Sequence, residues 1–186
     1  GTSLLKVLIA DDEINIILLI KSLIDRQKTD VEIAGEAGDG ITALEMVRQL
    51  KPDVVITDIR MPGMNGMDLI RHVREEQIPV EFVIISGYSE FEYARSAIQY
   101  GVSDYLLKPI KKDELNDVLA KLESQRASRR EQQMQFNLME DRLASNNGIL
   151  RKNLLQNLLM GDGELFRQAL GTGKVKDIFD YRGSFF

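Results

Sequence analysis

Short runs of Val, Ile and Leu recur in this chain, and charged residues directly follow three of them. These charged residues are Asp11, Asp12, Asp58 and Lys108. Runs this short and this apolar are typical of strands that are buried on both faces of a parallel sheet. A polar residue at the carboxyl end of such a strand leaves the core and faces the crevice where open α/β sheets bind ligands. We therefore expect three carboxylates and one ammonium group to meet at one edge of a sheet.

This set of charges favours metal-assisted phosphoryl chemistry. Taken alone, the Asp11-Asp12 pair could cap a following helix, because Asp is a favoured N-cap residue, and Lys108 could form an ordinary ion pair. Taken together, three carboxylates repel one another unless a cation neutralises them. Mg²⁺ suits such a site because it prefers oxygen ligands and keeps several of its waters. With Mg²⁺ bound, one carboxylate can act as the nucleophile toward a phosphoryl group.

Strand and helix patterns alternate five times between Lys6 and about Leu122. The expected strands are Lys6–Ala10, Val31–Ala37, Val54–Thr57, Glu81–Ile85 and Asp104–Leu107. The segments between them carry apolar residues at helical spacing, and Gly101 is placed to cap the last helix before the fifth strand. Such alternation predicts parallel βαβ units with right-handed crossovers, and hence a three-layer α/β sandwich around a parallel sheet.

Length and composition narrow the class of protein. The chain has 186 residues, a net charge of −5 and no cysteine. The length suits one domain with an appendage, and the acidic balance argues against nucleic-acid binding by most of the chain. The absence of cysteine excludes disulfides and thiolate metal sites. No apolar run approaches the ~18 residues of a membrane span, and no signal-peptide pattern opens the chain. We expect a cytoplasmic protein without a membrane partner.

The composition changes after Leu122. Residues 123–147 are rich in Gln, Arg, Glu and Asn, contain no Pro or Gly, and should continue the preceding helix. A seven-residue register, interrupted at Arg129, runs through Leu115, Leu122, Phe136, Leu143 and Leu150. The register fits either a coiled coil or a single solvated helix. Because an apolar stripe needs burial, we expect residues 115–160 to mediate homodimerisation.

Two further boundaries are predicted in the C-terminal part. Asn147-Gly148 should break the long helix, and residues 149–160 should then form a second amphipathic segment. From Gly161 onward, repeated glycines fragment the pattern. We expect residues 161–186 to be the start of a further, truncated region.

The order of the motifs resembles the receiver domain of bacterial two-component response regulators over about residues 4–122. The motifs are Asp11-Asp12, Asp58–Gly66, Ser86-Gly87 and Tyr105–Pro109. The resemblance implies a flavodoxin-like (βα)5 fold with the strand order of that family, followed by an α-helical linker or dimerisation segment at 123–160. It also implies a signalling switch and not a classical enzyme, because such a domain catalyses only its own Mg²⁺-dependent phosphotransfer and dephosphorylation.

The resemblance assigns a role to each site residue. Asp58 would accept the phosphoryl group from a sensor histidine kinase, and Ser86 and Lys108 would contact that group. Ser86 and Tyr105 would form the conformational switch. The Mg²⁺ ligands would be the side chains of Asp11, Asp12 and Asp58 and the backbone carbonyl of Arg60. Family members usually carry the peptide bond between Lys108 and Pro109 in the cis form.

The stretch Ser86–Ala94 resembles regulators whose output is an AraC-type helix-turn-helix DNA-binding domain. Residues 123–186 contain no convincing pair of DNA-reading helices, so DNA binding would belong to sequence that is missing after Phe186. The resemblance therefore implies transcriptional control by a part of the protein outside this chain.

The sequence argues against two other functions and leaves a third open. A phosphatase of the haloacid dehalogenase type needs a second acid two residues after the nucleophile, where this chain has Arg60. A purely structural interaction domain would not need the intact acidic set, and an RNA-binding or enzymatic output in the missing part stays open. Arg60 and Tyr88 flank the expected phosphoryl site, where they either slow hydrolysis of the phosphoaspartate or lie on the surface without a kinetic role.

Overall fold

The computed structural model describes residues 4–87 and 98–159 of the chain. Its centre is a parallel sheet with the strand order β2-β1-β3-β4-β5. The strands are β1 (Leu5–Ala10), β2 (Val31–Ala37), β3 (Val54–Asp58), β4 (Glu81–Ser86) and β5 (Asp104–Leu107). All five predicted strands are confirmed, and β1, β3 and β4 are each one residue longer than predicted.

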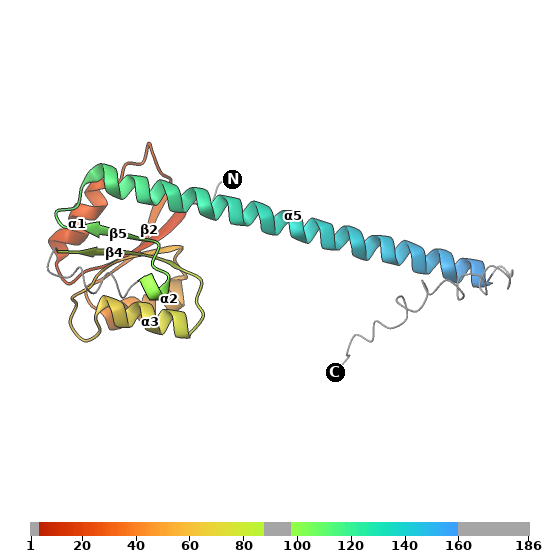
Figure 1. Cartoon of the computed structure of the whole chain (residues 1–186), viewed down its shortest axis with the longest axis horizontal. Helices are drawn as coiled ribbons and strands as arrows, with labels where there is room; N and C mark the ends of the chain where they lie inside the picture. The colour runs from red at the N-terminus through yellow and green to blue at the C-terminus, as the bar shows by residue number, and fades with distance from the viewer. Residues whose placement is uncertain (1–3, 88–97, 160–186) are drawn as a thin grey trace. The chain divides into compact units, whose positions relative to one another are not determined.

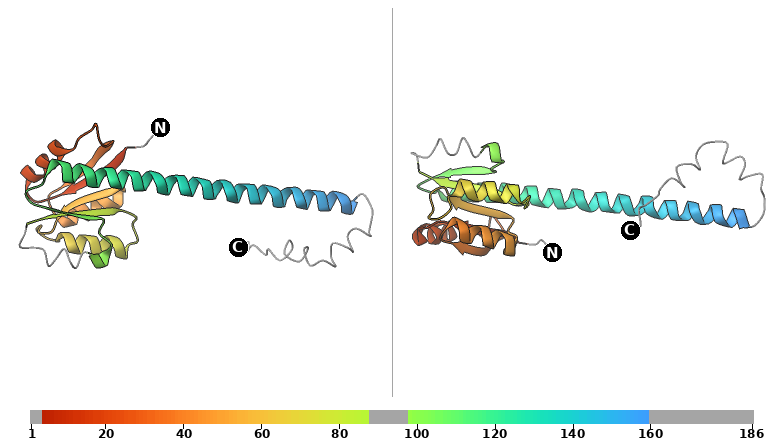
Figure 2. Two further views of the ribbon diagram at one scale, coloured as in Figure 1. Left: turned by 45° about the horizontal axis from the view of Figure 1, so that its top comes forward. Right: turned by 90° about the horizontal axis from the view of Figure 1, so that it is seen from below.

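Helices cover both faces of the sheet, which gives the three layers that the sequence predicts (Figures 1 and 2). The helices are α1 (Ile14–Leu23), α2 (Gly40–Leu50), α3 (Gly66–Glu75) and α5 (Lys112–Leu159), and a 3-10 turn spans Ile98–Tyr100. Helix α1 and the first turns of α5 pack on one face, and α2 and α3 pack on the other. The helix predicted before Gly101 falls mainly on residues 88–97, which lie outside the described residues.

The core is divided by the sheet into two apolar layers. Side chains of successive strand residues point to opposite faces, so Val7 and Ile9 of β1 pack toward α1 and α5, whereas Leu8 and Ala10 pack toward α2 and α3. All five residues of β3 are buried. Because both faces of the strands are buried, the strand sequences are unbroken apolar runs. Polar side chains that could do chemistry are therefore found only at the strand ends.

One predicted helix boundary is wrong. Helix α5 continues from Lys112 to Leu159 and passes through Asn147 and Gly148 without a break. A glycine inside a helix costs only about 1 kcal/mol relative to alanine, which is too little by itself to end a helix of this length. A glycine ends a helix by adopting positive φ, as Gly101 does before β5 with a φ of +67°. Gly148 does not do so.

The chain forms two compact units, residues 1–129 and 130–186. The first unit contains the sheet, its covering helices and the part of α5 up to Arg129. Within residues 4–87 and 98–159, none of the helices combines the length and the hydropathy that crossing a bilayer requires.

Buried Asn116 joins α5 to the end of α1. Its side-chain oxygen accepts a hydrogen bond from the backbone N–H of Asp25 at 2.7 Å, and its amide nitrogen donates to the carbonyls of Leu23 at 2.8 Å and Lys112 at 2.7 Å. The backbone groups after the end of α1 therefore find their partner on another helix. This contact keeps α1, which begins just after the acidic pair, in a fixed position.

Gly66 sets the distance between α3 and the end of β3. Its N–H donates to the carbonyl of Ile59 at 2.7 Å, and a Cβ atom at this position would lie 2.1 Å from the carbonyl oxygen of Asp58. The side chain of Asn65 caps the helix by accepting a hydrogen bond from the N–H of Asp68. The first residue of α3 thus contacts the main chain of the aspartate that ends β3.

We predict that Gly66→Ala destabilises the protein by about 1–3 kcal/mol or more, because the methyl group must displace backbone and not a flexible side chain. Chemical denaturation measures the loss. Gly38→Ala is the matched control, because a Cβ at Gly38 meets nothing within 4 Å, and it should change stability by no more than about 0.5 kcal/mol. Equal effects of the two substitutions would contradict the close contact.

Candidate functional site

Three carboxylates meet at the carboxyl edge of the sheet. Asp11, Asp12 and Asp58 each present an oxygen, and these oxygens lie within 4.8 Å of one another. Strands β1 and β3 are paired neighbours in the sheet, so residues at or just after their carboxyl ends come together. Asp11 and Asp58 are only 2% and 6% exposed, whereas Asp12 is exposed to solvent. The cluster is therefore a mostly buried acidic site with one open side.

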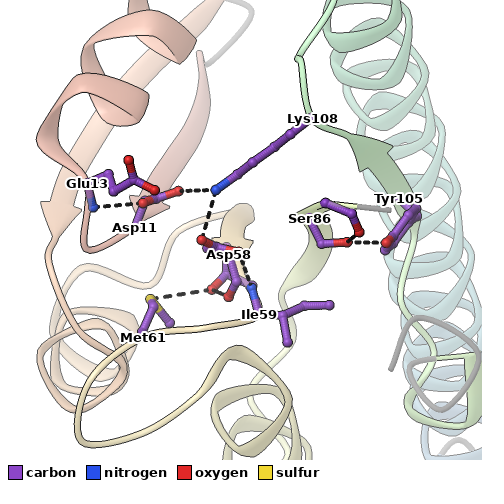
Figure 3. A network of polar contacts seen from close by, with 10 residues as sticks. Asp11, Glu13, Asp58, Ile59, Met61, Ser86, Tyr105 and Lys108 are labelled. Atoms are coloured by element: carbon purple, nitrogen blue, oxygen red, sulfur yellow. Dashed lines mark hydrogen bonds and ion pairs between the residues drawn. The ribbon is translucent and has the colours of Figure 1, made fainter. Parts of the chain in front are cut away.

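Lys108 provides the positive charge of the site. Its side chain reaches from the loop after β5 toward the acidic cluster (Figure 3). Its Nζ donates a hydrogen bond to Oδ2 of Asp58 at 3.0 Å and lies 3.6 Å from Oδ2 of Asp11. The Lys108 N–H also donates to the carbonyl of Ser86 at 2.8 Å, and the Lys108–Pro109 peptide is cis. The ammonium group of Lys108 thus lies close to two buried carboxylates, those of Asp58 and Asp11.

Burial and charge act on the site in opposite directions. Burial raises the pKa of Asp11, and the nearby charges of Asp58 and Asp12 add to this, although the Glu13 N–H and the Lys108 charge oppose it. Burial would lower the pKa of Lys108, but its hydrogen bond to Asp58 and the charges of Asp58 and Asp11 outweigh burial and raise that pKa. The ammonium group is therefore held in its charged form, while the pKa of Asp11 stays above its ordinary value.

Backbone donors fix the orientation of the two buried carboxylates. The Ile59 N–H donates to Oδ1 of Asp58 at 2.7 Å, and the Glu13 N–H donates to Oδ1 of Asp11 at 2.8 Å (Figure 3). Oδ2 of Asp11 is buried and has no hydrogen-bond partner among the described residues. An oxygen-rich cluster with such an orphaned acceptor fits a hard divalent cation, because Mg²⁺ satisfies carboxylate oxygens that no donor reaches.

A second polar pair lies beside the acidic cluster. Ser86 ends β4, next to β3, and is fully buried. Its hydroxyl is hydrogen-bonded to the hydroxyl of half-buried Tyr105 on β5, and it also donates to the carbonyl of Gly87 at 3.3 Å. The structure thus brings Ser86 and Tyr105 into direct contact. The side chain of Arg60 is exposed in the loop after β3, and Tyr88 lies outside the described residues.

Some contacts of the site were missed by the sequence analysis. The hydroxyl of Thr57 donates to the carbonyl of Asp58 at 2.9 Å and lies 4.0 Å from Sδ of Met61. Thr57 could have been noticed as the one polar residue inside the third apolar run. The donors from Ile59 and Glu13 are backbone N–H groups. The types of side chain at these positions do not reveal such contacts, so the sequence could not predict them.

The profile of the response regulator receiver domain matches residues 7–120. The chain belongs to the response regulator receiver family. Its strand order is also that of the flavodoxin-like fold, in which ligands bind at the carboxyl ends of the strands. Receiver domains are signalling switches, and the acidic cluster lies where this family binds Mg²⁺.

Two curated relatives are named as transcriptional regulatory proteins. YesN of Bacillus subtilis (strain 168) is 39% identical over 124 residues, which cover 64% of this chain and 34% of YesN. HptR of Staphylococcus aureus (strain NCTC 8325 / PS 47) is 39% identical over 117 residues, covering 63% of this chain and 46% of HptR. The matched part of the chain thus spans less than half of either relative.

Solved receiver domains share the fold. The REC domain of AraT, a response regulator from Geobacillus stearothermophilus, is 39% identical with a TM-score of 0.65, covering 69% of this chain and 99% of that one. A two-component transcriptional regulator AraC from Clostridium phytofermentans is 31% identical with a TM-score of 0.58, covering 64% of this chain and 92% of that one. These likenesses confirm the fold that the sequence predicts.

We predict that Tyr105→Phe costs about 1 kcal/mol of stability, because the fully buried Ser86 hydroxyl loses a hydrogen-bond partner. Denaturation in urea measures the change. Tyr100→Phe is the matched control, since the side chain of Tyr100 is exposed, and its effect should stay within about 0.5 kcal/mol. A Tyr105→Phe variant as stable as the control would contradict the importance of this contact.

Proposed function

We propose that this receiver domain is switched by phosphorylation of Asp58, which takes the phosphoryl group from a sensor histidine kinase of a two-component system. The observation that carries the proposal is the buried Asp58 carboxylate, which is grouped with Asp11 and Asp12 and hydrogen-bonded to Lys108. The backbone N–H of Ile59 and the ammonium of Lys108 hold the two oxygens of this carboxylate. It is thereby oriented before any substrate arrives.

The proposed Mg²⁺ ligands are the side chains of Asp11, Asp12 and Asp58 and the backbone carbonyl of Arg60. The cation supplies the charge neutralisation that lets an anionic nucleophile approach an anionic phosphoryl group. The orphaned Oδ2 of Asp11 supports this assignment. Exposed Asp12 is the most accessible of the three carboxylates.

The chemical step is a substitution at phosphorus. A carboxylate oxygen of Asp58 forms the new P–O bond, and the P–N bond to the kinase histidine breaks with its electron pair returning to the imidazole. Lys108 then pairs with a phosphoryl oxygen, and the hydroxyl of Ser86 donates to another. Ser86 must redirect its single hydroxyl proton from the carbonyl of Gly87 for this, and the hydroxyl of Tyr105, its other partner, is the group placed to report phosphorylation.

Helix α1 offers a surface for the kinase beside the acceptor. The helix begins at Ile14, directly after the acidic loop, and Ile14 and Leu18 are 58% and 52% exposed. These two residues are four apart and share one face of the helix. An exposed apolar patch next to a reactive group favours docking of a protein partner.

We predict that acetyl phosphate or phosphoramidate adds one phosphoryl group to the chain in the presence of Mg²⁺, and that EDTA blocks the reaction. Asp58→Asn should abolish the added mass, because the amide is a poor nucleophile. Intact-protein mass spectrometry measures the product. Undiminished labelling of the Asn variant would refute Asp58 as the acceptor.

Two further variants separate the metal from the switch. Asp12→Ala should weaken Mg²⁺ binding markedly, as followed by calorimetric titration, because it removes the exposed ligand. Lys108→Ala should affect Mg²⁺ binding much less, because Lys108 is not a ligand, but it should impair the response to phosphorylation. Wild-type Mg²⁺ affinity in Asp12→Ala would show that the ligand assignment is wrong.

The output of the switch is proposed to be control of transcription, through an AraC-type DNA-binding domain outside this chain. Support comes from YesN and HptR, which are named as transcriptional regulatory proteins, and from the two-component transcriptional regulator AraC of Clostridium phytofermentans. The matched segment covers only a minor part of YesN and HptR, which leaves room for such a domain. A protein with these partners would act in the cytoplasm.

The later part of α5 is proposed to pair with a second copy of the chain. Phe136, Met139 and Leu143 are 57%, 66% and 60% exposed. Their spacings of three and four residues are those of a coiled-coil seam. Because α5 continues through Gly148, the register extends without a break to Leu150. An exposed apolar stripe of this kind can be buried against the same stripe of a second, parallel copy related by two-fold symmetry. Such a dimer also suits an output domain that binds paired DNA sites.

We predict that the full chain sediments as a dimer at tens of micromolar, and that the compact unit 1–129 sediments as a monomer. In the full chain, Phe136→Glu should shift the equilibrium toward monomer, because it places like charges in the seam. Gln135→Glu, one residue away and outside the stripe, is the matched control and should leave the dimer intact. A monomeric full chain would refute the proposal.

A further inference from the structure

Two arginines of α5 contact the sheet at its amino edge, opposite the acidic cluster. Arg126 forms an ion pair with Asp53, with 2.7 Å between Nε and Oδ1, and donates from its guanidinium to the carbonyl of Leu4 at 3.2 Å. One turn later, Arg129 pairs with Glu81, with 2.6 Å between Nη1 and Oε1. We call these two ion pairs the arginine clamp.

The acidic partners of the clamp are themselves built into the sheet. Asp53 directly precedes β3, and its Oδ2 accepts a hydrogen bond from the N–H of Lys6 in β1 at 2.8 Å. Glu81 is the first residue of β4 and also accepts a hydrogen bond from the hydroxyl of Ser103, the residue before β5. The two carboxylates therefore connect the clamp to the starts of four strands.

Glu81 is held as an anion by its surroundings. Burial would raise its pKa, but hydrogen bonds from Ser103 and Arg129 and the charges of Arg129 and Arg74 outweigh burial and hold the pKa below its ordinary value. Arg74 lies nearby because it donates to the carbonyls of Tyr100, Gly101 and Val80 and stacks over the ring of Phe82.

The clamp explains why the heptad register is interrupted at Arg129. Earlier members of the stripe, Leu115 and Leu122, are buried against the sheet and α1. The later member Phe136 is exposed. At Arg129 the neighbour of the helix is the carboxylate of Glu81, so an arginine fits where a leucine would remove an ion pair from that carboxylate.

The two ion pairs differ in strength. The side chains of Arg126 and Asp53 are 17% and 24% exposed, whereas those of Arg129 and Glu81 are 70% and 27% exposed. Solvent screens an exposed pair strongly, so the Arg126 pair is the stronger anchor and the Arg129 pair adds to it.

We propose that the arginine clamp makes the first turns of the linker helix a rigid part of the receiver, so that the helix leaves the domain at Arg129 and not at Leu122. Each strand that carries a site residue at its carboxyl end, namely β1, β3, β4 and β5, is connected to the clamp at its amino end. Arg126 and Arg129 are thus positioning residues for the output helix. The inference rests on the proposed function only in treating α5 as the route to the output.

The test measures the distance between two spin labels, one on each side of the sheet. The chain has no cysteine, so labels attach only at the introduced thiols of Glu45→Cys on α2 and Ser128→Cys on α5, both exposed positions. Labelled chains are diluted with unlabelled chains to exclude distances between copies. The otherwise unchanged protein should give one narrow distance distribution, and Arg126→Ala with Arg129→Ala should replace it with a broad one.

A second double variant changes the two carboxylates of the arginine clamp, which belong to the sheet side of the contact. Asp53→Asn with Glu81→Gln keeps the shapes of the side chains, removes their charges, and should broaden the distribution in the same way. Arg142→Ala, an arginine later on the same helix, is the matched control and should leave it narrow. A narrow distribution in either double variant would overturn the inference. Phosphoramidate labelling of the same proteins, read by mass, reports separately on Asp58.

Discussion

The receiver depends on a charge balance in which one ammonium group serves two buried carboxylates. Lys108 contacts both Asp58 and Asp11 at the carboxyl edge of the sheet, and exposed Asp12 adds a third negative charge. The surplus of negative charge makes the site incomplete without a cation or a ligand. This incompleteness suits a switch, because a site that is fully satisfied at rest would gain little from a new partner.

The parallel sheet separates two polar edges by an apolar core. The carboxyl edge holds the acidic cluster with Ser86 and Lys108, and the amino edge holds Asp53 and Glu81 with the arginines of α5. Between them the strands are closely packed on both faces. Close-packed interiors transmit displacement and do not absorb it. The strands are therefore suited to pass a displacement at the carboxyl edge of the sheet to helix α5 at the amino edge.

Features that depend on the local sequence pattern were predicted correctly, whereas features that depend on tertiary contacts were not. Double burial makes each strand a short apolar run, so the strands and the acids at their ends were predictable from spacing alone. The break at Gly148 was predicted wrongly, because propensity is a weak guide inside a long helix. The partners of Asn116 and Arg129 were also missed. Both side chains act on groups far away in the sequence, and no local pattern marks such a contact.

The arginine clamp has a consequence for hybrid regulators. The last core residue of α5 is Leu122, which makes it the obvious point at which to join a foreign helix. A joint at that point would remove Arg126 and Arg129 and leave Asp53 and Glu81 facing whatever side chains the new helix supplies. A joint placed after Arg129 keeps both partners. The usable module is therefore longer than its apolar core, and the proper fusion point is set by two ion pairs.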